Sequence, residues 1–195
     1  MNLPNKITIA RIIMILIFLV VCNVDDQLPT HLQKSWRAAG FIFSIIAGLT
    51  DILDGYIARK YNMVSDFGKL MDPLADKIFI VTAFIMMVDK NLLPGWIAVI
   101  ILSREFMVTG LRLLAANKGI VISADVTGKI KTSLQMSFLI MGGSIWVGWL
   151  QMESLGLIWP ISMGIVVIFT VYSGVSYFIQ HRDLYMDSLV TTNSP

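Results

Sequence analysis

Residues 40–60, GFIFSIIAGLTDILDGYIARK, carry an apolar run directly into a charged segment. Asp51, Asp54 and Arg59 fall in the second half of this stretch, in a chain that is 56% hydrophobic. Charges in or beside a membrane helix cost free energy, so they need either an early exit to water or a counter-ion. The stretch therefore indicates a membrane helix whose charged end calls for a specific explanation.

The composition of the whole chain agrees with a membrane protein. Only 14% of its 195 residues are charged, whereas a soluble domain has about 25%. About 20 mostly apolar residues cross a bilayer core of about 30 Å. Six stretches meet or nearly meet that length: 6–24, 36–60, 72–89, 93–117, 127–150 and 155–180. We predict an all-α integral membrane protein with six transmembrane helices in a single domain, residues 1–182. A polar tail, 183–195, follows, with disorder expected from 187 onward.

The positions of the basic residues predict the orientation. Six spans place both termini on one side, and cytoplasmic loops are enriched in Lys and Arg. With the N-terminus inside, the outer side keeps Lys34, Arg37 and Lys90. The inner side collects Lys6, Arg11, Arg59, Lys60, Lys69, Lys77, Lys118, Lys129, Lys131 and Arg182. We therefore expect a multi-pass protein of the cell membrane, with both termini and the 51–76 segment at the cytoplasmic face.

Several classes of site are excluded by composition. The single cysteine, Cys22, cannot form an internal disulfide, and His31 and His181 lack the spacing of zinc ligands. The formal charge of +2, with basic residues spread along the chain, gives no argument for nucleic-acid binding. Any bound metal would have to be held by carboxylates.

Four aspartates form the candidate centre. The helix period places Asp51, Asp54 and Gly55 on one face, and Asp72 and Asp76 lie four residues apart at the start of the next predicted helix. Neighbouring carboxylates at a low-dielectric edge raise one another's pKa unless a cation compensates them. Mg²⁺ and Mn²⁺ prefer oxygen ligands and often share them with phosphate groups. The pattern predicts one or two metal ions that clamp a phosphate-containing substrate.

The alternative is that these aspartates are interfacial cap residues. Asp72, directly before Pro73, would be a good helix N-cap. This explanation suits one isolated aspartate better than four that share helix faces with small residues beside Arg59. We therefore favour the metal site.

The spacing resembles a family signature. Asp51-x2-Asp54-Gly55-x2-Ala58-Arg59-x8-Gly68-x3-Asp72-x3-Asp76 is similar, at every fixed position, to the motif of the CDP-alcohol phosphotransferases. Eight fixed residues over 26 positions make this a specific match. The resemblance extends over the whole chain, because that family has a six-helix membrane core with the motif across its second and third helices.

The resemblance implies an activity and residue roles. A CDP-linked lipid or alcohol would donate its phosphoryl group to an alcohol and release CMP. Asp51, Asp54 and Asp72 would ligate one metal, and Asp51, Asp72 and Asp76 the second. Asp76 would also be the general base for the acceptor hydroxyl. The nucleotide end would be lined by Gly55, Ala58, Arg59, Ser65 and Gly68.

A second charged feature concerns the acceptor. Arg104 and Arg112 are eight residues apart and share one face of the fourth predicted helix, with Arg104 deep in an apolar span. Lys129 and Lys131 begin the fifth helix on the cytoplasmic side. Because Arg grips phosphate well, these cations predict a pocket for an anionic acceptor. Two alternatives stay open: the lysines are ordinary inside-flanking charges, and Arg104 pairs with Glu105 or an aspartate.

Within the family, NLPNKITIAR at the N-terminus and SREFMVTGLR with GKIKT most resemble phosphatidylglycerophosphate synthases. This implies CDP-diacylglycerol as donor and sn-glycerol 3-phosphate as acceptor. Asn5, Thr8 and Arg11 recur in that N-terminal pattern and are expected to border the site, although the first two could also be helix caps. Relatives that use serine, inositol phosphate or phosphatidylglycerol share the aspartate motif, and inositol phosphate suits the same cations.

Two other classes of membrane protein share part of this pattern. Membrane prenyltransferases also hold a diphosphate through aspartates and Mg²⁺, but on two well-separated segments of a longer chain. A transporter would place charges near mid-membrane on several helices, whereas these aspartates fall within 26 residues. A homodimer is expected from the family resemblance alone.

Overall fold

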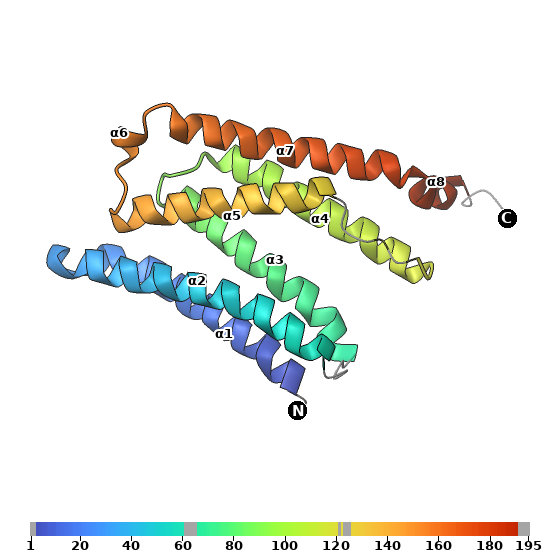
Figure 1. Ribbon diagram of the computed structural model, residues 1–195, viewed down its shortest axis with the longest axis horizontal. Helices are drawn as coiled ribbons and strands as arrows, with labels where there is room; N and C mark the ends of the chain where they lie inside the picture. The colour runs from blue at the N-terminus through green and yellow to red at the C-terminus, as the bar shows by residue number, and fades with distance from the viewer. Residues whose placement is uncertain (1–2, 61–65, 121, 123–125, 191–195) are drawn as a thin grey trace. The chain divides into compact units, whose positions relative to one another are not determined.

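The computed structural model describes residues 3–60, 66–120, 122 and 126–190, with side chains for 9–10, 12–48, 77–120, 122 and 126–186. All regular elements in these ranges are helices (Figure 1). They are α1 Leu3–Val24, the short 3-10 helix η1 Asp25–Gln27, α2 Thr30–Lys60, α3 Asp66–Asp89, α4 Gly95–Asn117, α5 Val126–Val147, α6 Met152–Leu155, α7 Ile158–Gln180 and α8 Arg182–Val190. The predicted all-α class is confirmed for the described residues.

Two helices begin well before the predicted spans. α2 begins at Thr30 rather than at 36, and α3 at Asp66 rather than at 72. An apolar span ends at its first polar residues, whereas a helix continues as long as its backbone hydrogen bonds do. Asp72 thus lies inside α3, and the alternative in which it caps the N-terminus is wrong. The disorder predicted from 187 onward is also wrong for 187–190, which belong to α8.

One helix of the described ranges, α7, has the length and apolar composition needed to cross a membrane. Its apolar side chains are largely exposed, since Ile161, Ile168 and Val175 are all more than half exposed. Its buried residues, by contrast, include Thr170 and Ser173. An apolar exterior over a more polar interior is the reverse of an ordinary soluble helix.

The chain divides into two compact units. Unit one comprises residues 1–93 with 141–151, and unit two comprises 94–140 with 152–195. The helix α5 therefore contributes its first part to unit two and its end to unit one.

In unit one, α1 packs against both α2 and α3. Phe18 and Cys22 of α1 are buried with Met86 of α3, and the partly buried Leu19 and Trp146 cover them. Close packing of these side chains holds α1 against α3.

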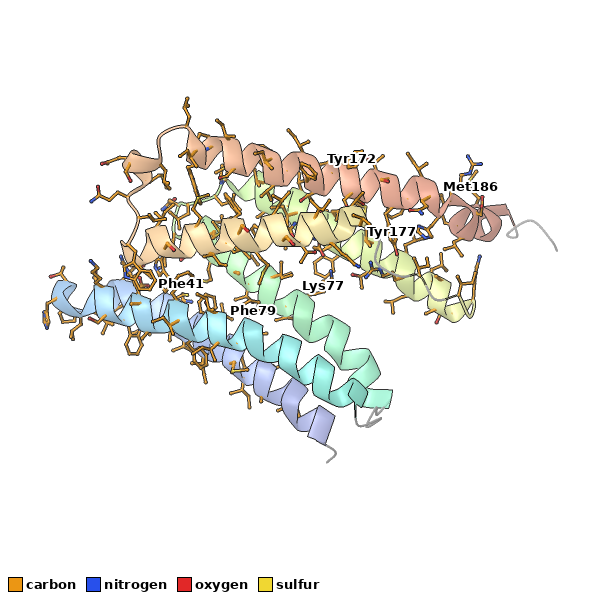
Figure 2. All side chains as sticks on the ribbon, in the orientation of Figure 1. Phe41, Lys77, Phe79, Tyr172, Tyr177 and Met186 are labelled. Carbon is orange, nitrogen blue, oxygen red and sulfur yellow. The ribbon has the colours of Figure 1, made fainter. Side chains whose placement is uncertain are left out.

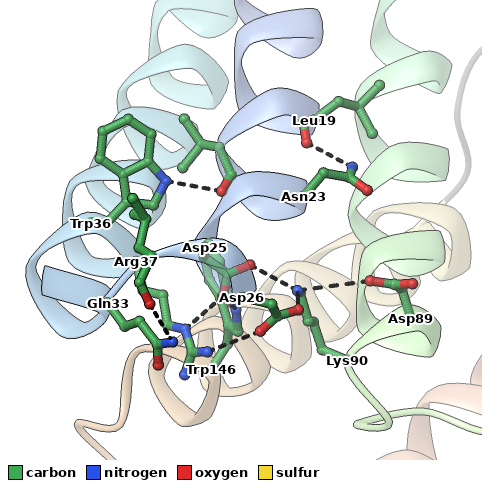
Figure 3. Close-up of polar contacts among 12 residues, drawn as sticks. Leu19, Asn23, Asp25, Asp26, Gln33, Trp36, Arg37, Asp89, Lys90 and Trp146 are labelled. Carbon is green, nitrogen blue, oxygen red and sulfur yellow. Dashed lines mark hydrogen bonds and ion pairs between the residues drawn. The ribbon is translucent and has the colours of Figure 1, made fainter. Parts of the chain in front are cut away.

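One end of unit one is held by a network of polar side chains around Asp25, which is fully buried (Figure 3). Its carboxylate accepts hydrogen bonds from Arg37 Nε at 2.6 Å, Lys90 Nζ at 2.8 Å and Trp146 Nε1 at 3.1 Å. The exposed Asp26 accepts from the same two cations, at 3.2 and 2.5 Å. We call these five residues the Asp25 network. They link η1, α2, α5 and the residue that follows α3.

Unit two is built on α4 and α7, which pack together. Val108 and Leu111 of α4 are buried with Tyr177 of α7. The first part of α5 joins them, since Phe138 stacks on Trp159 with ring centroids 4.7 Å apart. Contacts between α4 and α8 complete the unit.

Candidate active site

The signature residues lie on regular helical backbone in unit one, in the last third of α2 and the first half of α3. Their positions on the helices are therefore defined. Their side chains lie outside the described set, so the predicted metal and nucleotide contacts stay predictions. The predicted residues concerned are Asn5, Thr8, Arg11, Asp51, Asp54, Gly55, Ala58, Arg59, Ser65, Gly68, Asp72 and Asp76.

One described contact joins the two signature helices next to the signature. A Cβ added at Gly48 of α2 would lie 3.7 Å from Cε1 of Phe79 on α3 (Figure 2). Asp51 comes three residues after Gly48, and Asp76 comes three residues before Phe79. Because the helices run in opposite directions, both aspartate positions lie about 4.5 Å along the axes from this contact, on the same side of it. Asp72 follows one turn further on.

The start of α1 lies level with this segment. Trp36 Nε1 donates a hydrogen bond to the carbonyl of Val21 at 3.0 Å, and Gly40 packs against the same valine, so α1 and α2 are antiparallel. Trp36 and Gly40 both contact Val21, so position 38, midway between them, is level with Val21. Thr8 lies thirteen residues before Val21, and Asp51 lies thirteen residues after position 38. The three predicted border residues of α1 are therefore level with the signature of α2. In Figure 1 the start of α1 lies at the same end of unit one as the end of α2 and the start of α3.

Two of the four predicted acceptor-binding cations come together in unit two. Arg104 Nη1 lies 3.2 Å from Glu105 Oε1, and Lys131 Nζ pairs with the same oxygen. Arg104 also donates from Nη2 to Ser173 Oγ at 2.6 Å. The alternative in which Arg104 pairs with Glu105 is therefore correct. The pairing leaves Nε of Arg104 buried without a hydrogen-bond partner among the described residues.

The other two predicted cations have different surroundings. Arg112, two turns further along α4, donates from Nε to Tyr177 Oη at 3.0 Å, with its guanidinium carbon 5.4 Å from the centre of that ring. Figure 2 marks Tyr177 among the side chains of unit two. Lys129 is exposed. The structure thus separates a buried cation pair, Arg104 with Lys131, from two more accessible positive charges.

The sequence interpretation did not identify three buried polar side chains of unit two, of which Ser173 is the partner of Arg104. Ser173, Thr170 and Gln135 are each at most 1% exposed. Gln135 donates to Thr170 Oγ1 at 3.2 Å, and its own Oε1 has no partner in the described part of the chain. Their spacing in the sequence could have indicated them. Gln135 follows Lys131 by one helical turn and Thr170 precedes Ser173 by nearly one turn, so each pair lies on one helix face.

Comparison with known proteins shows the family of the chain. The family model of CDP-alcohol phosphatidyltransferases matches residues 1–179. A Bacillus subtilis protein named CDP-diacylglycerol–glycerol-3-phosphate 3-phosphatidyltransferase is 42% identical over 189 residues, which cover 91% of this chain and 93% of the relative. A Rickettsia felis protein of the same name is 38% identical over 180 residues, with coverage of 91% and 93%. The chain therefore belongs to the CDP-alcohol phosphatidyltransferase family, as its aspartate signature predicts.

Proposed function

We propose that this chain transfers the phosphatidyl group of CDP-diacylglycerol to sn-glycerol 3-phosphate, forming phosphatidylglycerophosphate and CMP. The observation that carries the proposal is the match of residues 1–179 to the CDP-alcohol phosphatidyltransferase family, and the Gly48–Phe79 contact supports it because the positions of Asp51 and Asp76 lie close along the chain to that contact. The printed names of the relatives supply the donor and the acceptor.

The donor set fits divalent cations. Four carboxylates on two opposed helices supply hard oxygen ligands, and carboxylates together with substrate phosphates are the usual ligands of Mg²⁺. We propose two Mg²⁺ or Mn²⁺ ions, one held by Asp51, Asp54 and Asp72 and the other by Asp51, Asp72 and Asp76. When bound, they would neutralise the charge that develops on the phosphoryl oxygens and on CMP. The CDP end of the donor would contact Gly55, Ala58, Arg59, Ser65 and Gly68.

The proposed reaction is a direct displacement. Asp76 takes the proton of the acceptor hydroxyl, and the hydroxyl oxygen bonds to the phosphorus that carries the diacylglycerol. The bond from that phosphorus to the bridging oxygen of the diphosphate breaks, and its electron pair leaves with CMP. Asn5, Thr8 and Arg11 would border this centre, because α1 is level with it.

The acceptor's phosphate would be held by the cations of unit two. Arg104 and Lys131 both contact one oxygen of Glu105, so two of these cations lie close together. Arg112 and Lys129 would add attraction for the acceptor. An anionic acceptor fits such a group better than serine does.

The proposal includes the membrane arrangement. The helices α1, α2, α3, α4, α5 and α7 have 22 to 31 residues, and about 20 suffice for one crossing. Arg37 and Lys90, both assigned to the outer side, meet at Asp25, which supports one common side for them. Six crossings would put both termini and the aspartates at the cytoplasmic face of the cell membrane. A homodimer is proposed from the family alone.

The test is CMP release by the purified protein in detergent with CDP-diacylglycerol and Mg²⁺. Glycerol 3-phosphate, inositol phosphate and serine are supplied in parallel reactions. We expect release with glycerol 3-phosphate and none after chelation by EDTA. Release with inositol phosphate or serine instead would contradict the acceptor assignment, and metal-independent release would contradict the ion site.

A further inference from the structure

The interior of unit two contains polar side chains where its helices α4, α5 and α7 pack together. Gln135 of α5 is 1% exposed, Thr170 of α7 is fully buried, and Arg104 of α4 is 8% exposed. A buried polar atom costs free energy unless it has a hydrogen-bond partner, and most such atoms in proteins have one. Each polar atom of these three side chains is therefore expected to be paired.

Two of these atoms have no partner in the described part of the chain. Gln135 donates from Nε2 to Thr170 Oγ1 at 3.2 Å, but no described group donates to its Oε1. Arg104 donates from Nη2 to Ser173 Oγ at 2.6 Å, but no described group accepts from its Nε. Gln135 Oε1 is an acceptor and Arg104 Nε is a donor. One molecule that both accepts and donates would therefore satisfy both.

The two atoms lie about one helical turn apart along α7. A Cβ added at Gly174 would lie 3.9 Å from Arg104 Nε, so this nitrogen lies beside Gly174. Thr170, which binds the amide of Gln135, precedes Gly174 by four residues on the same face of α7. Four residues rise about 6 Å, and a water with two hydrogen bonds of about 2.8 Å spans nearly the same distance. One water therefore fits this separation, and Gly174 places no side chain at that turn.

We infer that one ordered water molecule is bound inside unit two, where it accepts a hydrogen bond from Arg104 Nε and donates one to Gln135 Oε1. Buried waters commonly make two to four hydrogen bonds to polar groups of this kind. If the amide of Gln135 is turned over, its nitrogen replaces Oε1 and the same water accepts from both side chains. The inference goes beyond the proposed function and does not depend on it.

The bound water gives Gln135 a structural role. Through Thr170 and the water, the amide of Gln135 joins α5 to both α7 and α4. Loss of the amide would release the water from one of its partners and leave Arg104 Nε buried and unpaired, which is unfavourable. Without the water, Oε1 would be an unpaired buried oxygen, and its removal would be favourable. The sign of the effect therefore distinguishes the two cases.

The direct test detects the water by water-edited solid-state NMR. The whole protein, labelled with ¹⁵N at arginine, is studied in lipid bilayers without either substrate. We expect magnetisation to pass from water to the Nε–H group of Arg104, whose resonance is identified by its loss in Arg104→Lys. Arg112, which is exposed, supplies the positive control. In Gln135→Met the transfer to Arg104 should fall well below the wild-type value.

The second test measures Tm of the double variant Gln135→Met with Thr170→Val, which replaces both partners of the printed hydrogen bond by apolar side chains of similar shape. We expect Tm to fall by about 4 °C or more, because the water loses a partner and Arg104 Nε is left unpaired. The control Gln180→Met makes the same change at an exposed residue of α7 and should shift Tm by less than about 2 °C.

Three results would overturn the inference. Absence of magnetisation transfer to Arg104 in the wild-type protein would show that no water lies at Nε, and this result needs no substituted protein. Transfer that is unchanged in Gln135→Met would show that Gln135 does not hold the water. A Tm of the double variant equal to or above the wild-type value would show that Oε1 was unpaired.

Discussion

Asp25→Asn should destabilise unit one more than the substitution of an exposed residue does. It removes the buried negative charge to which both Arg37 and Lys90 donate hydrogen bonds. The buried carboxylate accepts three hydrogen bonds, from Arg37, Lys90 and Trp146. Removing one partner of a buried ion pair costs about 3–5 kcal/mol. The side chains of Arg37 and Lys90 are 26% and 12% exposed and keep some water. We therefore expect the lower end, about 3 kcal/mol.

The assay is thermal unfolding in detergent. For a chain of this length, 1 kcal/mol shifts Tm by about 2–4 °C, so Asp25→Asn should lower Tm by about 6–12 °C. The matched control is Asp26→Asn, which removes a carboxylate that binds the same two cations from a side chain 62% exposed. Exposed pairs contribute about 0–1 kcal/mol, so its shift should stay below about 4 °C. Equal shifts for the two variants would refute the argument that burial of Asp25 sets the strength of the network.

Three further predictions follow from the site and the charges. Asp76→Asn should lower kcat by about 10²–10⁴-fold while donor binding is largely kept, because the general base is lost; retained turnover would show that another group takes the proton. Arg112→Ala should raise the KM for glycerol 3-phosphate more than that for CDP-diacylglycerol, and equal rises would remove Arg112 from the acceptor pocket. The hydrogen bond from Lys90 lowers the pKa of Asp26 from its ordinary value of 3.8. The ionised Asp26 therefore adds to Tm above pH 3.8, and this stabilisation is lost as the pH falls below that value. Burial alone would lower the pKa of Lys90, but its hydrogen bonds to Asp25 and Asp26 raise the pKa above the ordinary 10.5. The stabilisation by charged Lys90 is therefore lost only above pH 10.5. An acid-side loss of Tm that persists unchanged in Asp26→Asn would contradict this assignment.

The parts of the fold that the sequence predicts are those set by local periodicity. The six apolar stretches all correspond to helices, and the aspartates lie on helical backbone of α2 and α3, as their spacing predicts. The errors lie at polar helix ends, where the first turns of α2 and α3 extend beyond the apolar segment. The helix α8 was missed for the same reason, because a polar, short helix has no apolar stripe to reveal it.

The polar interactions could not be predicted because they join distant parts of the chain. Asp25 meets Lys90 and Trp146 at sequence separations of 65 and 121 residues. Lys131 reaches Glu105 across 26 residues. A sequence shows that such a charge needs a counter-ion, but the choice among several available partners depends on helix packing. For Arg104 the alternatives named from sequence did include the correct partner, since Glu105 is its neighbour.

The central claim is that the signature face of α2 and α3 transfers a phosphatidyl group to glycerol 3-phosphate. The most direct measurement follows radiolabelled glycerol 3-phosphate into lipid and counts CMP in the same reaction, with Mg²⁺ and CDP-diacylglycerol. The account predicts one labelled phosphatidylglycerophosphate for each CMP with the wild-type protein, and both products lowered about 10²–10⁴-fold with Asp76→Asn. CMP formed without label in the lipid fraction would mean that the donor is only hydrolysed, and would contradict the claim.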